Sequence, residues 1–145
     1  MKQTFNLEML NERTREVKES IEKIRSYTAV PDKDFFADER NLYTIEHLLL
    51  ICVESVATIC SHLMAKLARK SSASYGECFQ GLQELGILDH ELLERLIRMA
   101  RLRNLLVHRY WEVDSKRILQ YARENLGDFE AFLEQVGKFV GQSGE

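Results

Sequence analysis

The sequence has few of the residues that interrupt helices. One proline and seven glycines are spread over 145 residues, so few positions force a turn. The sequence also lacks the alternation of apolar and polar residues that marks a half-buried strand. These absences exclude a turn-rich β fold and predict long helices.

Several motifs of catalysis and ligand binding are also missing. There is no glycine-rich phosphate loop and no G-x-S-x-G motif, and the three cysteines include no C-x-x-C pair. Cys60 and His62 would lie about 200° apart on a helix, so they could not bind one metal ion together. We therefore expect no metal ion, no tightly bound cofactor, and free thiols in a reducing compartment.

No segment reads as a signal peptide or a membrane span. The first ten residues lack an apolar core, and the longest apolar run, Leu48 to Val53, is too short to cross a bilayer. These features predict a cytoplasmic protein without a membrane partner.

The residues that are present predict a single all-α domain over 1–145. Hydrophobic residues make up 45% and charged residues 30% of the chain, as in globular proteins. Apolar residues recur every three or four positions, and between Leu48 and Cys60 they surround the helix, which predicts a central position in a bundle. About five helices are expected, near 7–30, 35–70, 74–86, 89–106 and 115–140.

Helix boundaries can be read at several positions. Ser74 and Glu77 have the spacing of a capping box, and Gly86 suits the end of the same helix. Asp89 is a favourable N-cap for the next helix. Gly127 is the expected place for a bend in the last helix.

Positive charge is concentrated in one part of an otherwise acidic chain. The formal net charge is −3, yet the window from Arg95 to Arg117 carries +5, which suggests an anionic partner at one place. Within it, Asn104 and His108 are four residues apart and share a helix face. Arg103 is about 140° from His108 on an ideal helix. A helix distortion, a wrapped arginine side chain or a second subunit could each bring the two together.

Arginine and histidine together suit phosphate chemistry. A guanidinium binds phosphate in a bidentate manner, and an imidazole exchanges protons near neutral pH. A base that activates the 2′-hydroxyl of RNA and a cation that stabilises the phosphorane would cleave RNA without a metal ion. The alternative is that the histidine is a surface or capping residue at a helix end.

Three stretches resemble one known family. The run RNLLVHRY, Arg103 to Tyr110, is similar to the R-x4-H-x-Y motif of the HepT toxins, a branch of the HEPN superfamily also called DUF86. The run from Ser74 to Leu88 and the run from Leu48 to Leu63 are similar to the family's stretch before the motif helix and to its long second helix. The resemblance covers nearly the whole chain.

The resemblance implies a fold, an activity and a partner. The fold would be a five-helix HEPN bundle, paired as a homodimer with the two motifs facing each other across a cleft. The activity would be a metal-independent endoribonuclease, the toxin of a type VII toxin–antitoxin system. Its partner would be an MntA-like nucleotidyltransferase antitoxin that transfers AMP from ATP to Tyr110, and the size of a larger hetero-oligomer with the antitoxin stays open.

The resemblance also implies roles for individual residues. Arg103 would bind and polarise the scissile phosphate, His108 would act as general base or acid, and Asn104 would position the histidine or the substrate. Tyr110 would be the AMPylation site. Three further arginines would hold RNA backbone phosphates or, equally, form a solvated helix face: Arg98, Arg101 and Arg109.

Glu54 stands out because it lies in the apolar middle of a predicted helix. A buried carboxylate needs a partner, and Arg103 and His62 are the candidates. The pairing would fix the active arginine or be a purely structural ion pair.

Two functions from other classes compete with the nuclease. The first is a non-catalytic HEPN module that binds nucleotide or RNA and scaffolds a nucleotidyltransferase. The second is a plain structural dimer. The presence of the complete set of motif residues permits catalysis and favours the nuclease over both.

Overall fold

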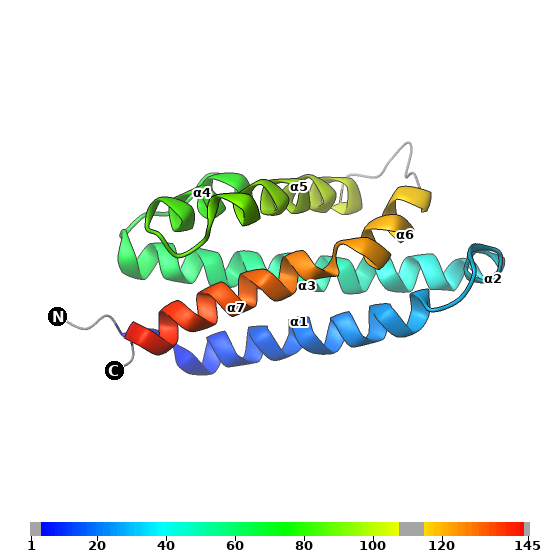
Figure 1. The fold of residues 1–145 in the computed structure, drawn as a ribbon, viewed down its shortest axis with the longest axis horizontal. Coiled ribbons are helices and arrows are strands. Elements are labelled where there is room, and N and C mark those ends of the chain that lie inside the picture. The colour runs from blue at the N-terminus through cyan, green and yellow to red at the C-terminus, as the bar shows by residue number, and fades with distance from the viewer. Residues whose placement is uncertain (1–3, 108–114, 144–145) are drawn as a thin grey trace.

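The computed structural model describes residues 4–107 and 115–143, which form seven helices and no strand. The predicted all-α fold is confirmed over this part of the chain. Figure 1 shows the helices in order: α1 Leu7–Thr28, α2 Asp32–Ala37, α3 Glu39–Leu67, α4 Tyr75–Glu84, α5 His90–Val107, α6 Ser115–Glu124 and α7 Leu126–Ser143.

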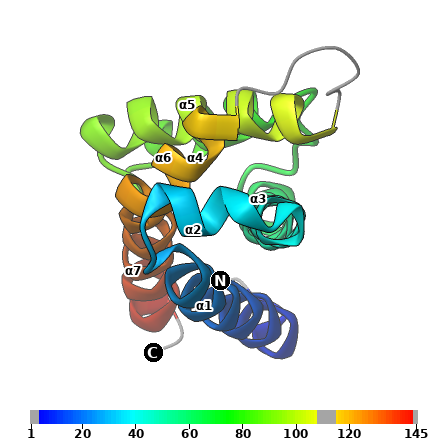
Figure 2. The same cartoon turned by 90° about the vertical axis from the view of Figure 1, so that its right-hand side faces the viewer.

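The long helix α3 is the centre of the bundle, as its apolar circumference predicted. It contacts each of the other six helices. In Figure 1, α1 runs along one side of it and α4 and α5 along the other, and the end-on view of Figure 2 shows the same order. Buried side chains such as Leu49, Val53 and Val56 fill the interior around it. The residues on α3 are therefore placed to meet partners from several helices.

By length and composition alone, α3 could also cross a membrane. Its most apolar window is 61% buried inside the bundle, however. The central helix of a globular protein meets the same criteria for the same reason, because both are hydrophobic all round. The apolar character of α3 is explained by the neighbours that cover it.

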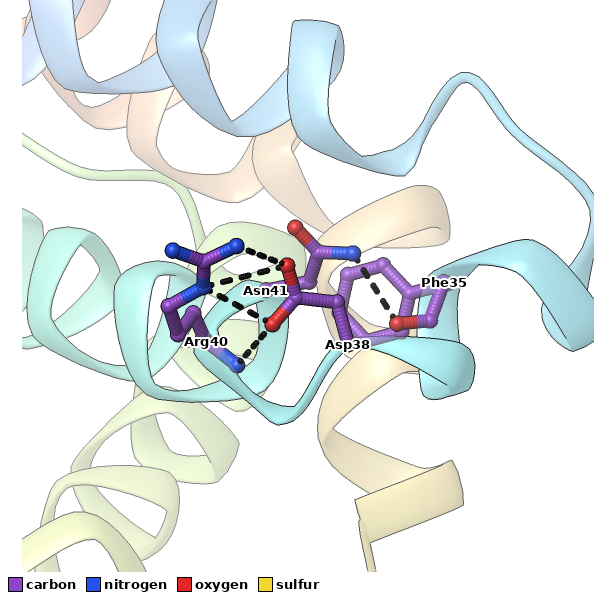
Figure 3. Close-up of polar contacts among 4 residues, drawn as sticks. All are labelled: Phe35, Asp38, Arg40 and Asn41. Carbon is purple, nitrogen blue, oxygen red and sulfur yellow. Dashed lines mark hydrogen bonds and ion pairs between the residues drawn. The ribbon is translucent and has the colours of Figure 1, made fainter.

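The second predicted helix is divided in two at Asp38. The Asp38 carboxylate caps α3 by accepting from the Arg40 backbone N–H at 3.0 Å, and Arg40 Nη2 donates back to it at 2.7 Å (Figure 3). Asn41 Nδ2 donates to the Phe35 carbonyl at 3.0 Å, which ties α2 to the start of α3 (Figure 3). Phe35 itself is fully buried. This local capping replaces one continuous helix with a short helix and a long one.

The last predicted helix is also divided, but not at Gly127. The break lies at Asn125, whose backbone N–H ends α6 by donating to the Tyr121 carbonyl at 2.9 Å. Its carbonyl then accepts from the Asp128 N–H at 3.1 Å as α7 begins. Gly127 lies inside α7, so the predicted bend is two residues too late. These two divisions account for seven helices where about five were expected.

The predicted ends of α4 and the predicted start of α5 are confirmed. Ser74 Oγ accepts from the Glu77 N–H at 3.2 Å, and Gly86 has the positive φ of +78° that suits a residue after a helix. Asp89 Oδ1 accepts from the Leu92 N–H at 2.7 Å, and Gln135 Nε2 of α7 donates to Asp89 Oδ2 at 2.8 Å. The start of α5 is therefore fixed both locally and by a distant helix.

Both ends of α1 are held by side chains from other helices. At its start, the Asn6 N–H donates to His62 Nε2 of α3 at 3.1 Å. Near its end, Arg123 of α6 donates from Nε to the Thr28 carbonyl at 3.3 Å and from Nη2 to the Val30 carbonyl at 2.6 Å. Arg123 Nη1 also pairs with Asp32. These contacts satisfy backbone groups that a helix end leaves without partners.

The described phenylalanines lie mostly in the core. Phe129 and Phe132 of α7 are fully buried, whereas Phe36 is 37% exposed. Phe5 and Phe139 bring the two ends of the chain together, with ring centroids 6.2 Å apart. The first and last helices therefore close one common core.

Candidate active site

An ion pair joins the middle of α3 to the last turns of α5. Arg103 Nε donates to Glu54 Oε1 at 3.1 Å. The Arg103 side chain is 28% exposed and the Glu54 side chain 44% exposed, so the pair lies at the surface of the bundle with its inner side covered. Of the two partners considered for Glu54, the structure brings Arg103 to it, while His62 holds the start of α1 instead.

Tyr75, the first residue of α4, completes the cluster. Its hydroxyl donates to Glu54 Oε2 at 2.7 Å. The Arg103 Cζ lies 5.2 Å from the centroid of the Tyr75 ring, which is within the range of a cation–π contact. Tyr75 therefore contacts both members of the ion pair. We refer to Glu54, Tyr75 and Arg103 as the arginine cluster.

The cluster keeps its arginine charged and its tyrosine neutral. The hydrogen bond to Glu54 raises the pKa of Arg103 above its usual value, against the opposing effect of burial. Burial raises the pKa of Tyr75, and the hydrogen bond to Glu54 raises it further. Arg103 can therefore act as a fixed cation but not as a base. In a nuclease, this is the role of a group that binds and polarises phosphate.

A small hollow adjoins the outer side of Glu54. It has a volume of about 260 Å³ and lies between α1 and α3. Its walls are formed by Arg13, Glu16, Leu50, Ile51, Glu54, Ser55 and Thr58. A larger hollow of about 1040 Å³ lies between α1 and α7 and includes no member of the arginine cluster. Of these two hollows, the smaller is the one that Glu54 lines.

The three described arginines of the predicted basic region that precede Arg103 on α5 do not join it. Arg98 and Arg101 are exposed, and on α5 they lie about 140° and 160° around the helix axis from Arg103. Asn104 is exposed and about 100° from it. Arg95 pairs with the buried carboxylate of Asp128 at 3.4 Å. The part of the basic window on α5 therefore splits into an inward arginine, an outward pair and a structural ion pair.

Part of the predicted motif lies outside the described residues. His108, Arg109 and Tyr110 all fall between the end of α5 and the start of α6. The expected pairing of Asn104 with His108, and the geometry between His108 and Arg103, remain predictions. Of the predicted catalytic residues, the structure places Arg103 and Asn104.

Tyr75 is the residue that the sequence did not reveal as part of the site. It is 21 residues from Glu54 and 28 from Arg103 in sequence, and no short motif links them. The local signals are its position directly after the Ser74 cap, which fixes where α4 begins, and its place in the run from Ser74 to Leu88 that resembles the family. The contact depends on how α4 and α5 pack on α3.

Metal ligation finds no support among the residues that the structure describes. No group of three or more histidine, cysteine, aspartate or glutamate side chains is arranged to hold a metal ion there. The three cysteines are buried free thiols.

Two curated proteins are similar in sequence. A protein named Putative RNase from Archaeoglobus fulgidus is 36% identical over 88 residues, which span 61% of this chain and 66% of that protein. The tRNA nuclease HepT of Aphanizomenon flos-aquae is 22% identical over 120 residues, which span 83% and 82% of the two chains.

Solved structures share the fold. The tri-AMPylated HEPN toxin of Shewanella oneidensis, in complex with an MNT antitoxin, has a TM-score of 0.83 at 22% identity and covers 90% of this chain and 97% of its own. YutE of Bacillus subtilis, a cytosolic protein of unknown function, has a TM-score of 0.83 at 11% identity, with coverages of 97% and 94%. At such identities the likeness concerns the fold alone.

A family model described as Ribonuclease HepT-like matches residues 17–136. This match begins within α1 and ends within α7, so it includes the whole arginine cluster. The chain belongs to the Ribonuclease HepT-like family.

Proposed function

We propose that the protein is a metal-independent endoribonuclease that acts as the toxin of a toxin–antitoxin pair. The observation that carries this proposal is the arginine cluster, in which a permanently charged guanidinium is held in place at the bundle surface. Family membership and relatives named as ribonucleases support the same activity. Transfer RNA is the first substrate to test, because one relative is named a tRNA nuclease.

The reaction would use the nucleophile that RNA itself carries. His108 takes the proton of the 2′-hydroxyl, and the 2′-oxygen attacks the adjacent phosphorus. The bond from phosphorus to the 5′-oxygen breaks, and a general acid gives that oxygen a proton. Arg103 neutralises the charge that develops on the phosphorane oxygens. The products are a 2′,3′-cyclic phosphate and a free 5′-hydroxyl, and Asn104 orients the histidine or the substrate.

A homodimer would complete this site. Arg103 and His108 stand on different sides of an ideal helix, and a second copy supplies the missing group if the two motifs face each other. Arg98, Arg101 and Arg109 would then contact RNA phosphates along the approach to the cleft. A cross-subunit site predicts that two inactive variants, Arg103→Ala and His108→Ala, regain part of the activity when they are mixed.

The same site would be the point of regulation. A nucleotidyltransferase antitoxin transfers AMP from ATP to the Tyr110 hydroxyl, with release of pyrophosphate. The added nucleotide brings bulk and negative charge into a basic region and repels RNA, as phosphorylation would. The Shewanella structure, a tri-AMPylated HEPN toxin with its MNT antitoxin, supports this interpretation by analogy.

The deciding experiment incubates the purified protein with tRNA and with total RNA in EDTA. We expect cleavage by the wild type and a loss of at least about a hundredfold for Arg103→Ala, which removes a transition-state donor, and for His108→Ala, which removes the general base. If the wild type and both variants all leave the RNA intact, the nuclease proposal is refuted. RNA binding without cleavage by the wild type would instead favour the non-catalytic module.

Regulation is tested separately with the nucleotidyltransferase of an MntA-type pair and ATP. We expect a mass increase of one or more AMP groups on the wild type, none on Tyr110→Phe, and loss of RNA cleavage in the modified protein. Mass spectrometry after proteolysis locates the modified residue. Modification at another residue, or full activity after modification of Tyr110, would contradict this part of the proposal.

A further inference from the structure

The arginine cluster is a closed triangle of three side chains from three helices. Glu54 of α3 accepts from Arg103 of α5 with one carboxylate oxygen and from Tyr75 of α4 with the other. The third side is the contact of the Arg103 guanidinium with the Tyr75 ring, at 5.2 Å. Tyr75 thus holds Arg103 in two ways, indirectly through Glu54 and directly through its ring.

Glu54 alone would hold Arg103 poorly. The Glu54 side chain is 44% exposed, and ion pairs at that exposure contribute little because water competes and both long side chains lose rotamer freedom. The Tyr75 hydroxyl fixes the second carboxylate oxygen and thereby the plane of the carboxylate. A fixed carboxylate presents one orientation to Arg103 Nε, and the ring below limits the tilt of the guanidinium.

Tyr75 can do this over the whole physiological pH range. Burial and the Glu54 hydrogen bond both raise the pKa of its hydroxyl, so the group remains protonated. A protonated hydroxyl next to a carboxylate is a donor with a single obvious acceptor. Tyr75 therefore keeps its role under all conditions in which the nuclease would act.

Packing of α4 does not depend on this hydroxyl. The buried side chains that attach α4 to the bundle are Cys78, Phe79 and Leu82, and Tyr75 is only partly buried at the first turn. Its hydroxyl bonds to a side chain and not to any backbone group that folding leaves unsatisfied. The hydrogen bond thus acts on the side chains of Glu54 and Arg103 and is not needed to attach α4 to the bundle.

We propose that Tyr75 is a positioning residue for Arg103, with the hydroxyl orienting Glu54 and the ring supporting the guanidinium. This inference rests on the proposed nuclease, in which Arg103 stabilises the transition state. A positioned charge acts on the transition state more than on substrate binding, because the phosphate attracts any nearby cation but the phosphorane needs one at a set place. Tyr75 should therefore control turnover more than affinity.

The kinetic test uses two substitutions that separate the hydroxyl from the ring. Tyr75→Phe keeps the ring and should lower kcat on tRNA about tenfold with KM within about twofold, and Tyr75→Leu should lower kcat about a hundredfold. Tyr27→Phe removes an exposed hydroxyl on α1 and should change neither. The proposal would be overturned if both Tyr75→Phe and Tyr75→Leu kept the wild-type kcat. It would also be overturned if their lower kcat were fully explained by a lower folded fraction of the protein.

A second test needs no RNA and separates this inference from the proposed activity. The Arg103 Nε–H can be followed by two-dimensional NMR, assigned by its absence in Arg103→Lys. We expect a sharp, slowly exchanging signal in the wild type, faster exchange in Tyr75→Phe, and further loss in Tyr75→Leu and Glu54→Gln. An Nε–H signal that Tyr75→Leu leaves unchanged overturns the positioning role. Absence of cleavage by the wild type with the expected NMR changes would refute only the nuclease.

Discussion

Arg123 and Arg103 are both helical arginines paired with a carboxylate from another helix, but they serve different partners. Arg123 donates to the Thr28 and Val30 carbonyls and pairs with Asp32, so it satisfies the backbone at the end of α1. Arg103 contacts the side chains of Glu54 and Tyr75. The first set of contacts closes a helix end, and the second holds a charge at the surface.

The two arginines differ in whether their contacts satisfy backbone groups, and this difference bears on the stability of the fold. A helix end that lacks partners for its carbonyls is costly, so Arg123 is explained by the stability of the bundle, and the caps made by Asp89 and His62 are explained in the same way. Among the described residues, the contacts of Glu54, Tyr75 and Arg103 with one another join side chains and satisfy no backbone group. A half-exposed ion pair contributes little stability, which is consistent with the role proposed for Arg103.

The sharpest test of this contrast compares Arg123→Ala with Arg103→Ala in denaturant unfolding. Arg123→Ala should lower the free energy of unfolding by about 2 kcal/mol, because hydrogen bonds to two carbonyls and a carboxylate are lost. Arg103→Ala should lower it by less than about 1 kcal/mol, because Glu54 can be solvated. Arg123→Lys, which keeps one donor group, should fall between the wild type and Arg123→Ala. Equal losses for the two alanine variants would remove the distinction.

The cap at the start of α5 gives a smaller effect of the same kind. Asp89→Ala should cost about 1 kcal/mol, the usual value of an N-cap. Asp89→Asn should restore only part of it, because its Oδ1 can still accept from the Leu92 N–H but its Nδ2 cannot accept from Gln135 Nε2. RNA cleavage per folded molecule should be unchanged in both variants, because the arginine cluster lies near the other end of α5. A cleavage defect in folded Asp89→Ala would show that the two ends of the helix are coupled.

His62 predicts a pH dependence of stability near neutrality. Burial lowers the pKa of His62 below its ordinary value of 6.5, and the charge of Lys66 lowers it further. The unfolded chain therefore takes up the proton at higher pH than the folded one, so stability is present above pH 6.5 and is lost as the pH falls below it. The loss should stay below about 1 kcal/mol, the worth of one hydrogen bond.

The matched variant for this prediction is His62→Gln, which offers an acceptor that does not titrate. Thermal unfolding of both proteins between pH 7.5 and pH 5 isolates the contribution of His62, since the other titrating groups are common to both. The wild type should lose more stability than the variant over this range. Parallel curves would mean that the Asn6 contact does not depend on the charge of His62.

The outward arginines should give the smallest effect. If Arg98 and Arg101 contact RNA phosphates, each change to alanine should weaken binding of non-cleavable tRNA about threefold at low salt. The slope of log affinity against log salt should fall by about 0.7 for each, as for single-stranded regions. Lys138→Ala on α7 is the control for loss of one exposed charge. An unchanged slope would assign Arg98 and Arg101 to a solvated face.

The sequence predicted the parts of the fold that depend on local signals. Ser74, Gly86 and Asp89 mark helix ends by their own chemistry, and their geometry in the structure agrees. The break at Asp38 was missed. Asp38 caps α3 by accepting from the Arg40 N–H, and Asn41 ties α2 to α3 by donating to the Phe35 carbonyl. Gly127 attracted the predicted bend by its flexibility, but the chain breaks at Asn125 instead.

The candidate site was predictable only in part, for a different physical reason. Arg103 and Glu54 could each be singled out, because a basic residue in a charged window and a carboxylate in an apolar run are visible in the sequence. Tyr75 could not, because its contacts depend on the packing of α4 against α3 and α5. The orientation of Arg98 and Arg101 away from Arg103 follows from helix geometry and could have been predicted.

The last helix, α7, closes the core and includes the contact of Phe139 with Phe5. This has a consequence for the protein while it is being synthesised. Glu54, Tyr75 and Arg103 leave the ribosome before α7, yet Phe129, Phe132 and Val136 of α7 fill the core beside α1 and α3. Until these residues arrive, the apolar faces of the earlier helices stay open to water, and α3 lacks part of its support. The nascent chain therefore carries Glu54, Tyr75 and Arg103 before the core that supports α3 is complete.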